Sequence, residues 1–346
     1  MRLIKVKVFV ESLTAHTSQF FTGLYMLQEQ GVVNVSLQQG RYASDALIRL
    51  QVNEIPVYID LADHANINVD EYERCAFYFK RMLLKTDAAC QQKLRPYGLN
   101  YAVYHKGDYT ITRSLYSGNT RHVVRSFLRA TPFMANLVNM DLGHHIARVH
   151  HFEQEASFLT DPKVIFSAKL WKPEKVKLSE KKQQRLAINQ QRIAIVREAK
   201  KRLGASFTGG INIDEYAAEV AADALVDNTG FSKRKSYLQL LKNCSIGIAN
   251  AGLEDSIGFK LAEYVCMSKA VVTSPINQYL LPGDFAENKN YLSFNNTAEE
   301  CVHKCLELLQ NESLRHEMMQ NNREYYRHYL HPAKLVMNIL TAITSS

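Results

Sequence analysis

Hydrophobic and polar positions follow two periods along this chain, and both halves repeat the same succession of short strands and longer helices. At the N-terminus, Lys5 and Lys7 alternate with apolar residues from Ile4 to Val10, the pattern of a strand with one buried face. Residues 18–30 follow with helical spacing. In the rest of the first half, the pattern predicts strands at residues 32–37, 55–61, 76–79 and 101–104, and a helix at residues 123–139.

A second succession begins after Asp161-Pro162. It predicts strands at residues 163–168, 206–208, 245–249, 270–274 and 291–294, helices that end at residues 203 and 242, and helices that include residues 261–267, 297–309 and 314–329. Pro332 is expected to break the last helix. Two alternating blocks predict an α/β fold with two doubly wound, Rossmann-like domains that face each other across a cleft. Ligands of such sheets bind beyond the carboxyl ends of the strands.

Composition and charge narrow the classes of function. Apolar residues make up 46% of the chain and the formal net charge is +8. No apolar run reaches the roughly 20 residues of a membrane span, and the N-terminal strand pattern differs from a signal peptide, so we expect a cytoplasmic protein. Basic segments at residues 163–182 and 185–202 favour anionic partners, including peripheral contact with an anionic membrane surface. We interpret residues 181–202 as a helix with a solvated basic face and an apolar stripe at Leu186, Ile193, Val196 and Leu203.

Several other kinds of site are disfavoured because the chain lacks the motifs that they require. The chain has no GxGxxG after a strand, no P-loop and no recognisable nucleic-acid-binding motif, so we expect neither a nicotinamide cofactor nor a nucleic-acid partner. The six cysteines form no CxxC pair and are expected to be reduced. Cys301 and Cys305 are interpreted as packing residues because no further metal ligands lie nearby in the sequence. The adjacent pairs His144-His145 and His150-His151 are interpreted as exposed or hinge residues, since neighbours point to different sides.

The candidate chemistry lies in residues 255–263, between a predicted buried strand and a predicted helix. A helix N-terminus presents unpaired backbone N–H groups and a partial positive charge, and both favour phosphate. The small residues at positions 256–258 would let this backbone approach a diphosphate. Lys260, in the first turn, would add a full positive charge. A carboxylate at Glu263 would accept hydrogen bonds from ribose hydroxyls, so the segment predicts a site for a sugar nucleotide.

This segment resembles the E-G-F-G-L-x-x-x-E motif of the retaining glycosyltransferases of the GT-B class. It reads Asp255, Ser256, Ile257, Gly258, Phe259, Lys260, Leu261, Ala262 and Glu263. The spacing between the two acids and the second glycine match, whereas Asp replaces the first Glu and Ser replaces the first Gly. In that family the first acid contacts the transferred sugar and the second holds the ribose. The resemblance implies these roles for Asp255 and Glu263, with Glu254 as the alternative sugar contact.

The resemblance extends over residues 163–335 and, in outline, over the first half. Lys169 matches the basic residue that meets the phosphates, and Lys175 matches a second lysine with the spacing off by one. Gly209 and Gly210 match the end of the next strand, and we assign both to the donor site. The resemblance implies an acceptor-binding domain at residues 1–160, a nucleotide-sugar domain at residues 161–330 and a C-terminal segment, residues 331–346, that packs back toward the first domain.

Two histidines are candidates for the reacting centre. His64 follows the predicted strand at residues 55–61 and resembles the family's histidine that faces the donor sugar. His16 follows the first strand, where inverting members carry the base that removes the acceptor proton. Either histidine could also be a packing residue. The acid motif favours retention at the anomeric carbon, and His16 leaves inversion open.

The acidic and basic residues of the predicted donor site indicate that it works without a metal and without a cofactor. No Asp-x-Asp pair occurs, and Lys169, Lys260 and the helix N-terminus would neutralise the leaving diphosphate. We therefore expect a glycosyltransferase that moves a sugar from a nucleoside diphosphate sugar to a hydroxyl of a glycan or lipid-linked acceptor. A sugar-nucleotide epimerase on the same fold and a catalytically silent binding subunit are the two alternatives.

Overall fold

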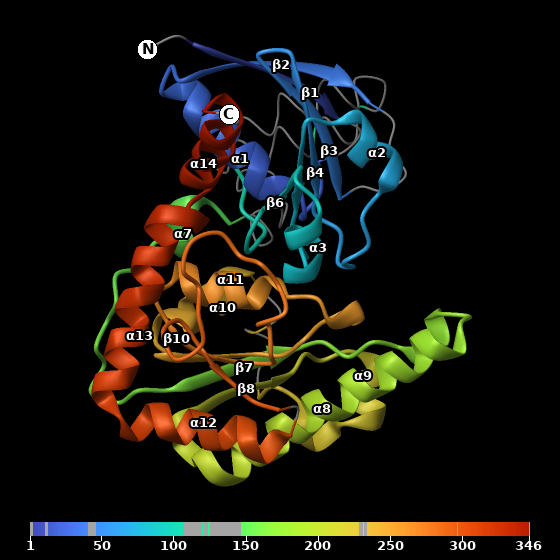
Figure 1. Cartoon of the computed structure of the whole chain (residues 1–346). Helices are drawn as coiled ribbons and strands as arrows, with labels where there is room; N and C mark the ends of the chain where they lie inside the picture. The colour runs from blue at the N-terminus through green and yellow to red at the C-terminus, as the bar shows by residue number, and fades with distance from the viewer. Residues whose placement is uncertain are drawn as a thin grey trace. The chain divides into compact units, whose positions relative to one another are not determined.

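The chain folds into two compact units, seen in a computed structural model that describes residues 3–10, 13–40, 46–106, 120, 124, 147–227, 231, 234–295 and 297–345 (Figure 1). The first unit comprises Met1–His151, Tyr279–Asp284 and Arg327–Ser346, and the second comprises Phe152–Gln278 and Phe285–Tyr326. The helix predicted at residues 123–139, apart from Val124, lies outside the described residues, as do His144 and His145.

In its described part, the first unit contains a six-stranded sheet in the order β2-β1-β3-β4-β5-β6. The strands are β1 (Ile4–Val10), β2 (Val33–Gln39), β3 (Leu47–Val52), β4 (Ile55–Asp60), β5 (Phe77–Lys80) and β6 (Leu94–Pro96). Neighbours pair in parallel, except that β3 is antiparallel to both β1 and β4. Since β3 alone is reversed, β1, β4, β5 and β6 point the same way and their carboxyl ends share one edge of the sheet.

Helices cover both faces of this sheet. Helices α1 (Ser18–Glu29) and α14 (Pro332–Thr344) pack on one face, against the apolar side chains of β1, β3, β4 and β5. Gly23 allows the two helices to approach, because a Cβ at this position would lie 2.1 Å from the carbonyl oxygen of Pro332. Helices α2 (Val69–Arg74) and α3 (Lys85–Cys90) contribute partly buried residues to the other face. The short helix α7 (Val149–Phe152) carries His150 and His151, both exposed.

The second unit contains a parallel sheet of five described strands in the order β11-β10-β9-β7-β8. The strands are β7 (Val164–Ala168), β8 (Phe207–Ile211), β9 (Ile246–Ala249), β10 (Ala270–Thr273) and β11 (Leu292–Ser293). The helices are α8 (Ser179–Leu203), α9 (Glu215–Val220), α10 (Arg234–Lys242), α11 (Phe259–Cys266), α12 (Ala298–Gln310) and α13 (Glu312–Tyr325). Helices α8 and α12 lie on one side of the sheet, and α10 and α11 lie on the other (Figure 1). Both units thus have the α/β architecture predicted from the sequence.

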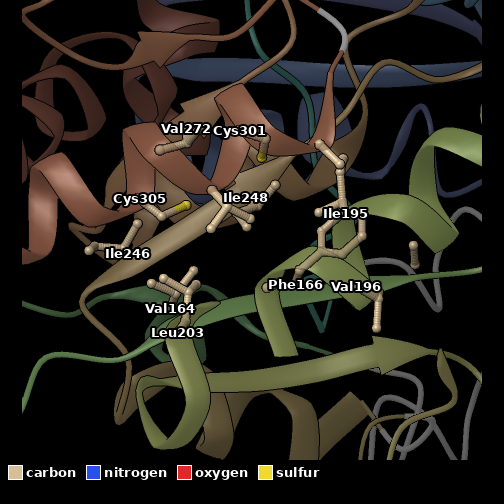
Figure 2. Packing of buried hydrophobic residues seen from close by; sticks show 14 of the residues in the cluster. Val164, Phe166, Ile195, Val196, Leu203, Ile246, Ile248, Val272, Cys301 and Cys305 are labelled. Atoms are coloured by element: carbon tan, nitrogen blue, oxygen red, sulfur yellow. The ribbon is translucent and has the colours of Figure 1, made fainter. Parts of the chain in front are cut away.

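The core of the second unit is built from the apolar faces of α8, α12 and the sheet. Figure 2 shows Cys301 and Cys305 of α12 among the side chains of β7, β9 and β10, and both are fully buried free thiols. The apolar stripe predicted for α8 is partly wrong. Leu186 is 38% exposed, whereas the residues that enter the core include Ile195, Val196, Ala199 and Leu203. The stripe is displaced because the first turns of α8 extend beyond the residues that it packs against.

Three further predictions of secondary structure need correction. Residues 101–104 form no strand, because the backbone of Val103 is satisfied by side chains of α1: its N–H donates to Ser18 Oγ and its carbonyl accepts from Thr22 Oγ1. The pattern missed β3 and β6 altogether. The pattern also missed α14: Pro332 ends the preceding helical run, as predicted, but it also begins α14, where a missing N–H costs nothing.

Candidate functional site

A pocket lies beyond the carboxyl ends of β9 and β10, where ligands bind in parallel α/β sheets. It is lined by Ala249, Asn250, Ala251, Asp255, Ser256, Ile257, Gly258, Leu261, Thr273, Ser274, Pro275 and Ile276. Its empty volume is about 240 Å³, including space open to solvent.

The loop before α11 carries an unusual backbone. Glu254 and Asp255 are consecutive non-glycine residues in the left-handed region, with φ angles of 57° and 56°. Such residues cost of order 1–3 kcal/mol each and concentrate at functional sites. The loop is closed on itself, since Gly252 N donates to the carbonyl oxygen of Ser256 at 2.9 Å. Asp255 lines the pocket, whereas the exposed Glu254 carboxylate pairs with Lys181 Nζ of α8 at 3.3 Å.

The N-terminus of α11 faces this pocket through Ser256, Ile257 and Gly258. Gly258 is the N-cap residue and, as a glycine, offers no side-chain oxygen to cap the helix. A Cβ added at Gly258 would meet no atom within 4 Å. The space beside Gly258 is therefore open. The positive end of a helix dipole favours an anion, and the open space at Gly258 would let an anion from outside the chain approach this end of α11.

Lys260 and Glu263 belong to a charged cluster next to the pocket and do not line it. The Glu263 side chain is 4% exposed, and its Oε1 lies 2.8 Å from Arg234 Nη2 of α10. Lys260 Nζ lies 3.6 Å from Glu263 Oε2 and 3.3 Å from the ring centroid of Tyr237. One carboxylate thus meets two cations, and the cluster carries one excess positive charge.

Burial and pairing shift the pKa values of this cluster. Burial lowers the pKa of Lys260 to about 8, although the Glu263 carboxylate opposes the shift. Burial alone would raise the pKa of Glu263, but Arg234 and Lys260 outweigh it and hold that pKa below its usual value. The Glu263 carboxylate is therefore ionised at neutral pH, while Lys260 changes charge near pH 8.

Lys169 lies at the end of β7, exposed, and a buried arginine connects its loop to the pocket. Arg192 of α8 donates through Nη1 to the carbonyl oxygen of Lys169 and through Nε to Asn250 Oδ1, at 3.2 Å. Asn250 lines the pocket, so Arg192 ties the carboxyl ends of β7 and β9 together. Lys175 ends a short 3-10 helix, Pro173–Lys175, and is exposed.

Gly209 and Gly210, which we had assigned to the donor site, lie inside β8 and do not line the pocket. Their φ angles are 139° and 150°, and a Cβ on Gly209 would lie 1.8 Å from the carbonyl oxygen of Phe166. A Cβ on Gly210 would lie 2.8 Å from the carbonyl oxygen of Ala224. The absence of a side chain at both positions is therefore explained by packing between β8 and its neighbours.

The two candidate histidines lie in the first unit. His16 belongs to the loop after β1 and His64 to the loop after β4, so both are at the carboxyl edge of the first sheet. Asn100 Nδ2 donates to the carbonyl oxygen of His16 at 2.8 Å and fixes that loop. The Nδ1 atom of His64 is buried and has no hydrogen-bond partner in the described part of the chain.

Sequence reasoning missed Arg192 and Arg234. Both lie on helices, where a basic residue normally indicates a solvated surface, and Arg192 falls in the segment interpreted as a basic face. A weak signal existed for Arg192, because it lies three and four residues before the apolar Ile195 and Val196 on the same helix face. No comparable signal precedes Arg234.

A search for other sites gives negative results for the described residues. They contain no group of three or more His, Cys, Asp or Glu side chains that could hold a metal ion. Nor does any helix within the described ranges combine the length and the apolar character needed to cross a membrane.

Comparison with known proteins finds likeness at the level of the fold. No protein-family model and no curated protein matches the chain. Among solved structures, it is similar to a glycosyltransferase from Rickettsia africae (10% identity, 95% of this chain and 82% of that one, TM-score 0.44). It is also similar to WaaG, a glycosyltransferase involved in lipopolysaccharide biosynthesis (11% identity, 98% and 99% covered, TM-score 0.40). A third is HepE from Anabaena in complex with UDP and glucose (10% identity, 93% and 89% covered, TM-score 0.37). Identities and TM-scores this low concern the fold alone.

Proposed function

We propose that this chain is a glycosyltransferase that moves a sugar from a nucleoside diphosphate sugar to a hydroxyl of a glycan or lipid-linked acceptor. One observation carries the proposal: the N-terminus of α11, with Gly258 as its N-cap residue, faces a pocket at the carboxyl edge of a parallel sheet, with open space beside Gly258. A helix N-terminus with a glycine at this edge suits a diphosphate. The neighbouring cluster adds a lysine for the phosphates and a carboxylate for the ribose.

The donor diphosphate would be neutralised by backbone and lysine charges. The backbone at Ser256, Ile257 and Gly258 would donate hydrogen bonds, and the helix dipole would favour the negative charge. Lys260 is 35% exposed, so its ammonium can turn from Glu263 toward the phosphates. Lys169, exposed at the end of β7, would add a second charge. Charge placed in advance where the leaving group develops its own charge is a large source of rate enhancement.

Asp255 is the better candidate for the contact with the transferred sugar. It lines the pocket, whereas the carboxylate of Glu254 pairs with Lys181 on the exposed surface. Through this acid we propose retention at the anomeric carbon.

His64 is proposed to face the reacting centre, with His16 as the alternative. His64 Nδ1 is buried without a partner in the described residues, and such an atom costs free energy unless a ligand satisfies it. A histidine can donate or accept a hydrogen bond near neutral pH. His64→Ala should lower turnover more than His16→Ala, and the opposite order would favour the inverting scheme with His16 as base.

The first experiment is a thermal-shift screen of the full chain against UDP, GDP, CDP and ADP and the corresponding sugars, followed by an assay of nucleoside diphosphate release. A stabilised protein that transfers sugar to an acceptor supports the proposal. Stabilisation without release or transfer indicates a silent binding subunit, and interconversion of donor sugars indicates an epimerase. The absence of any stabilisation overturns the donor site.

Metal independence is a separate part of the proposal. The positive charges of Lys169, Lys260 and the α11 N-terminus are arranged to do what a divalent cation would do at the diphosphate. Activity should persist in excess EDTA, with added Mg²⁺ or Mn²⁺ as the control. Activity that EDTA abolishes and Mn²⁺ restores would contradict this charge scheme.

A further inference from the structure

The charged cluster beside the pocket contains one carboxylate oxygen that the described residues leave unsatisfied. Glu263 Oε1 is paired with Arg234 at 2.8 Å. Glu263 Oε2 is buried and accepts no hydrogen bond in the described part of the chain. Lys260 Nζ lies 3.6 Å from Oε2, which is close enough for an ion pair but too far for a hydrogen bond. A buried acceptor of this kind is costly unless a ligand uses it.

Arg234 is itself held in place. Its guanidinium carbon lies 5.1 Å from the ring centroid of Phe152 and 5.9 Å from that of Tyr237, and its side chain is 19% exposed. Stacking on aromatic rings restricts a guanidinium more than it restricts a flexible ammonium. Helix α10 therefore presents a fixed cation to one oxygen of the carboxylate. That contact determines which oxygen remains available.

We propose that Arg234 is a positioning residue that holds Glu263 through Oε1 and so directs Oε2 to the ribose hydroxyls of the donor. The inference rests on the proposed function, because it requires a nucleotide in the adjacent pocket. Arg234 touches neither the sugar nor the phosphates in this scheme. Its action passes through Glu263, whose other oxygen has room for a hydroxyl donor once Lys260 turns toward the diphosphate.

The proposal predicts how the protein distinguishes ribose from deoxyribose. The probe is whichever of UDP, GDP, CDP and ADP gives the largest thermal shift, compared with its 2′-deoxy counterpart by calorimetry. The wild-type chain should bind the ribonucleotide about tenfold more tightly, the loss expected for a hydrogen bond to a charged group. Both Arg234→Gln and Glu263→Gln should reduce this ratio to about one. The double variant should show no further loss, because the two residues act as one unit.

A pH readout separates positioning from a general loss of structure. The groups that face Glu263 are Arg234 and Tyr237 of α10 and Lys260 and Tyr264 of α11. In Arg234→Gln, Lys260 alone would oppose the effect of burial, so the pKa of Glu263 would be higher than in the wild type. Ribonucleotide affinity of Arg234→Gln should therefore fall at a higher pH on the acid side than that of the wild type. Arg197→Gln, which removes an exposed arginine paired with Asp223, is the matched control and should change neither readout.

The outcomes distinguish this inference from the proposed function. If Arg234→Gln keeps the ribose preference while Glu263→Gln loses it, Glu263 binds ribose without help from Arg234 and the inference is wrong. If the wild-type chain binds the ribonucleotide and its deoxy counterpart equally, Oε2 is not the ribose acceptor and the inference is also wrong, although donor binding stands. If no nucleotide binds, both proposals are wrong. Should Arg234→Gln fail to fold, Arg234→Lys keeps the charge without the planar guanidinium and should give an intermediate ratio.

Discussion

The two units each bury a carboxylate between basic and aromatic side chains, and the two arrangements differ in one respect. In the first unit Asp60 accepts three hydrogen bonds: Tyr78 Oη and Lys80 Nζ donate to Oδ2 at 2.7 and 2.9 Å, and Ala62 N donates to Oδ1 at 3.0 Å. In the second unit Glu263 meets two cations, yet its Oε2 accepts no hydrogen bond in the described residues. Both oxygens of Asp60 accept hydrogen bonds, whereas Glu263 Oε1 forms an ion pair with Arg234 and Oε2 accepts no hydrogen bond from the described residues.

The difference extends to the cations. Lys80 is fully buried, and Asp60 is 2% exposed, so the pair has no route to solvent or ligand. Lys260 is 35% exposed and lies beside an open pocket. A buried pair whose hydrogen bonds are complete fixes the fold, whereas a buried acid that lacks a donor next to a movable cation is suited to binding. Burial of charge alone therefore does not distinguish the two carboxylates, whereas the unsatisfied oxygen of Glu263 does.

The strongest test of this comparison is the stability of Asp60→Asn. The substitution keeps the shape of the side chain but leaves the Lys80 ammonium buried without its counter-ion. Breaking such a pair typically costs about 3–5 kcal/mol, which urea unfolding should detect as a lower midpoint. Glu263→Gln should cost less, because Lys260 is 35% exposed and can reach water. If the two variants are equally destabilised, the distinction between a structural and a binding carboxylate fails.

The next largest effect is expected for Lys260→Ala. Loss of a preorganised charge at the leaving diphosphate should cost about 2–4 kcal/mol of transition-state stabilisation, measured as kcat/KM for the donor. Folding should be nearly unaffected, because the lysine is partly exposed and Glu263 keeps its ion pair with Arg234. Lys235→Ala, which removes an exposed lysine of α10, is the control. Unchanged turnover of Lys260→Ala would remove Lys260 from the phosphate site.

Two glycine positions extend the comparison between packing and binding. Gly258→Ala places a methyl group where no atom lies within 4 Å, so stability should be retained while the methyl obstructs the approach of a diphosphate. We expect donor affinity to fall about tenfold, or ~1.4 kcal/mol. Gly209→Ala should do the opposite, because its Cβ would overlap the carbonyl oxygen of Phe166 and destabilise the sheet. Calorimetry with the donor nucleotide and thermal unfolding of both variants distinguish the two roles; a Gly258→Ala variant that binds normally contradicts the proposed site.

Sequence periodicity predicted the strand-and-helix order well where strands are buried on both faces. The runs at residues 163–168, 245–249 and 270–274 became β7, β9 and β10 almost residue for residue. It failed for β3, whose six residues include Arg49 and Gln51, although these residues alternate with buried ones and β3 forms a hairpin with β4, in which Val52 pairs with Ile55. Residues 101–104 look like a strand, yet they are held by side chains of α1, a tertiary contact that no local pattern records.

The candidate site was predictable only where it depends on local sequence. Residues 255–258 lie at the pocket because a strand and a helix N-terminus place them there, as the motif indicates. Gly209 and Gly210 satisfied the same kind of motif, but close approaches of Phe166 to Gly209 and of Ala224 to Gly210 explain them. Arg234 could not be found, since its partner Glu263 lies 29 residues later and their meeting depends on how α10 packs beside α11.

The smallest expected effect is a pH dependence that separates Lys260 from Lys80. Burial lowers the pKa of both, to about 8 for Lys260, although Asp60 opposes the shift of Lys80 and Glu263 that of Lys260. A bound diphosphate would raise the pKa of Lys260, so donor affinity is highest below pH 8 and falls as pH rises through that value. Between pH 7 and 8.5 the protonated fraction of a group with this pKa drops about fourfold, and donor affinity should follow. Lys260→Arg should abolish the trend, because arginine stays charged. Lys80, fully buried beside Asp60, should contribute nothing to it, and a trend that survives in Lys260→Arg would assign the titration to another group.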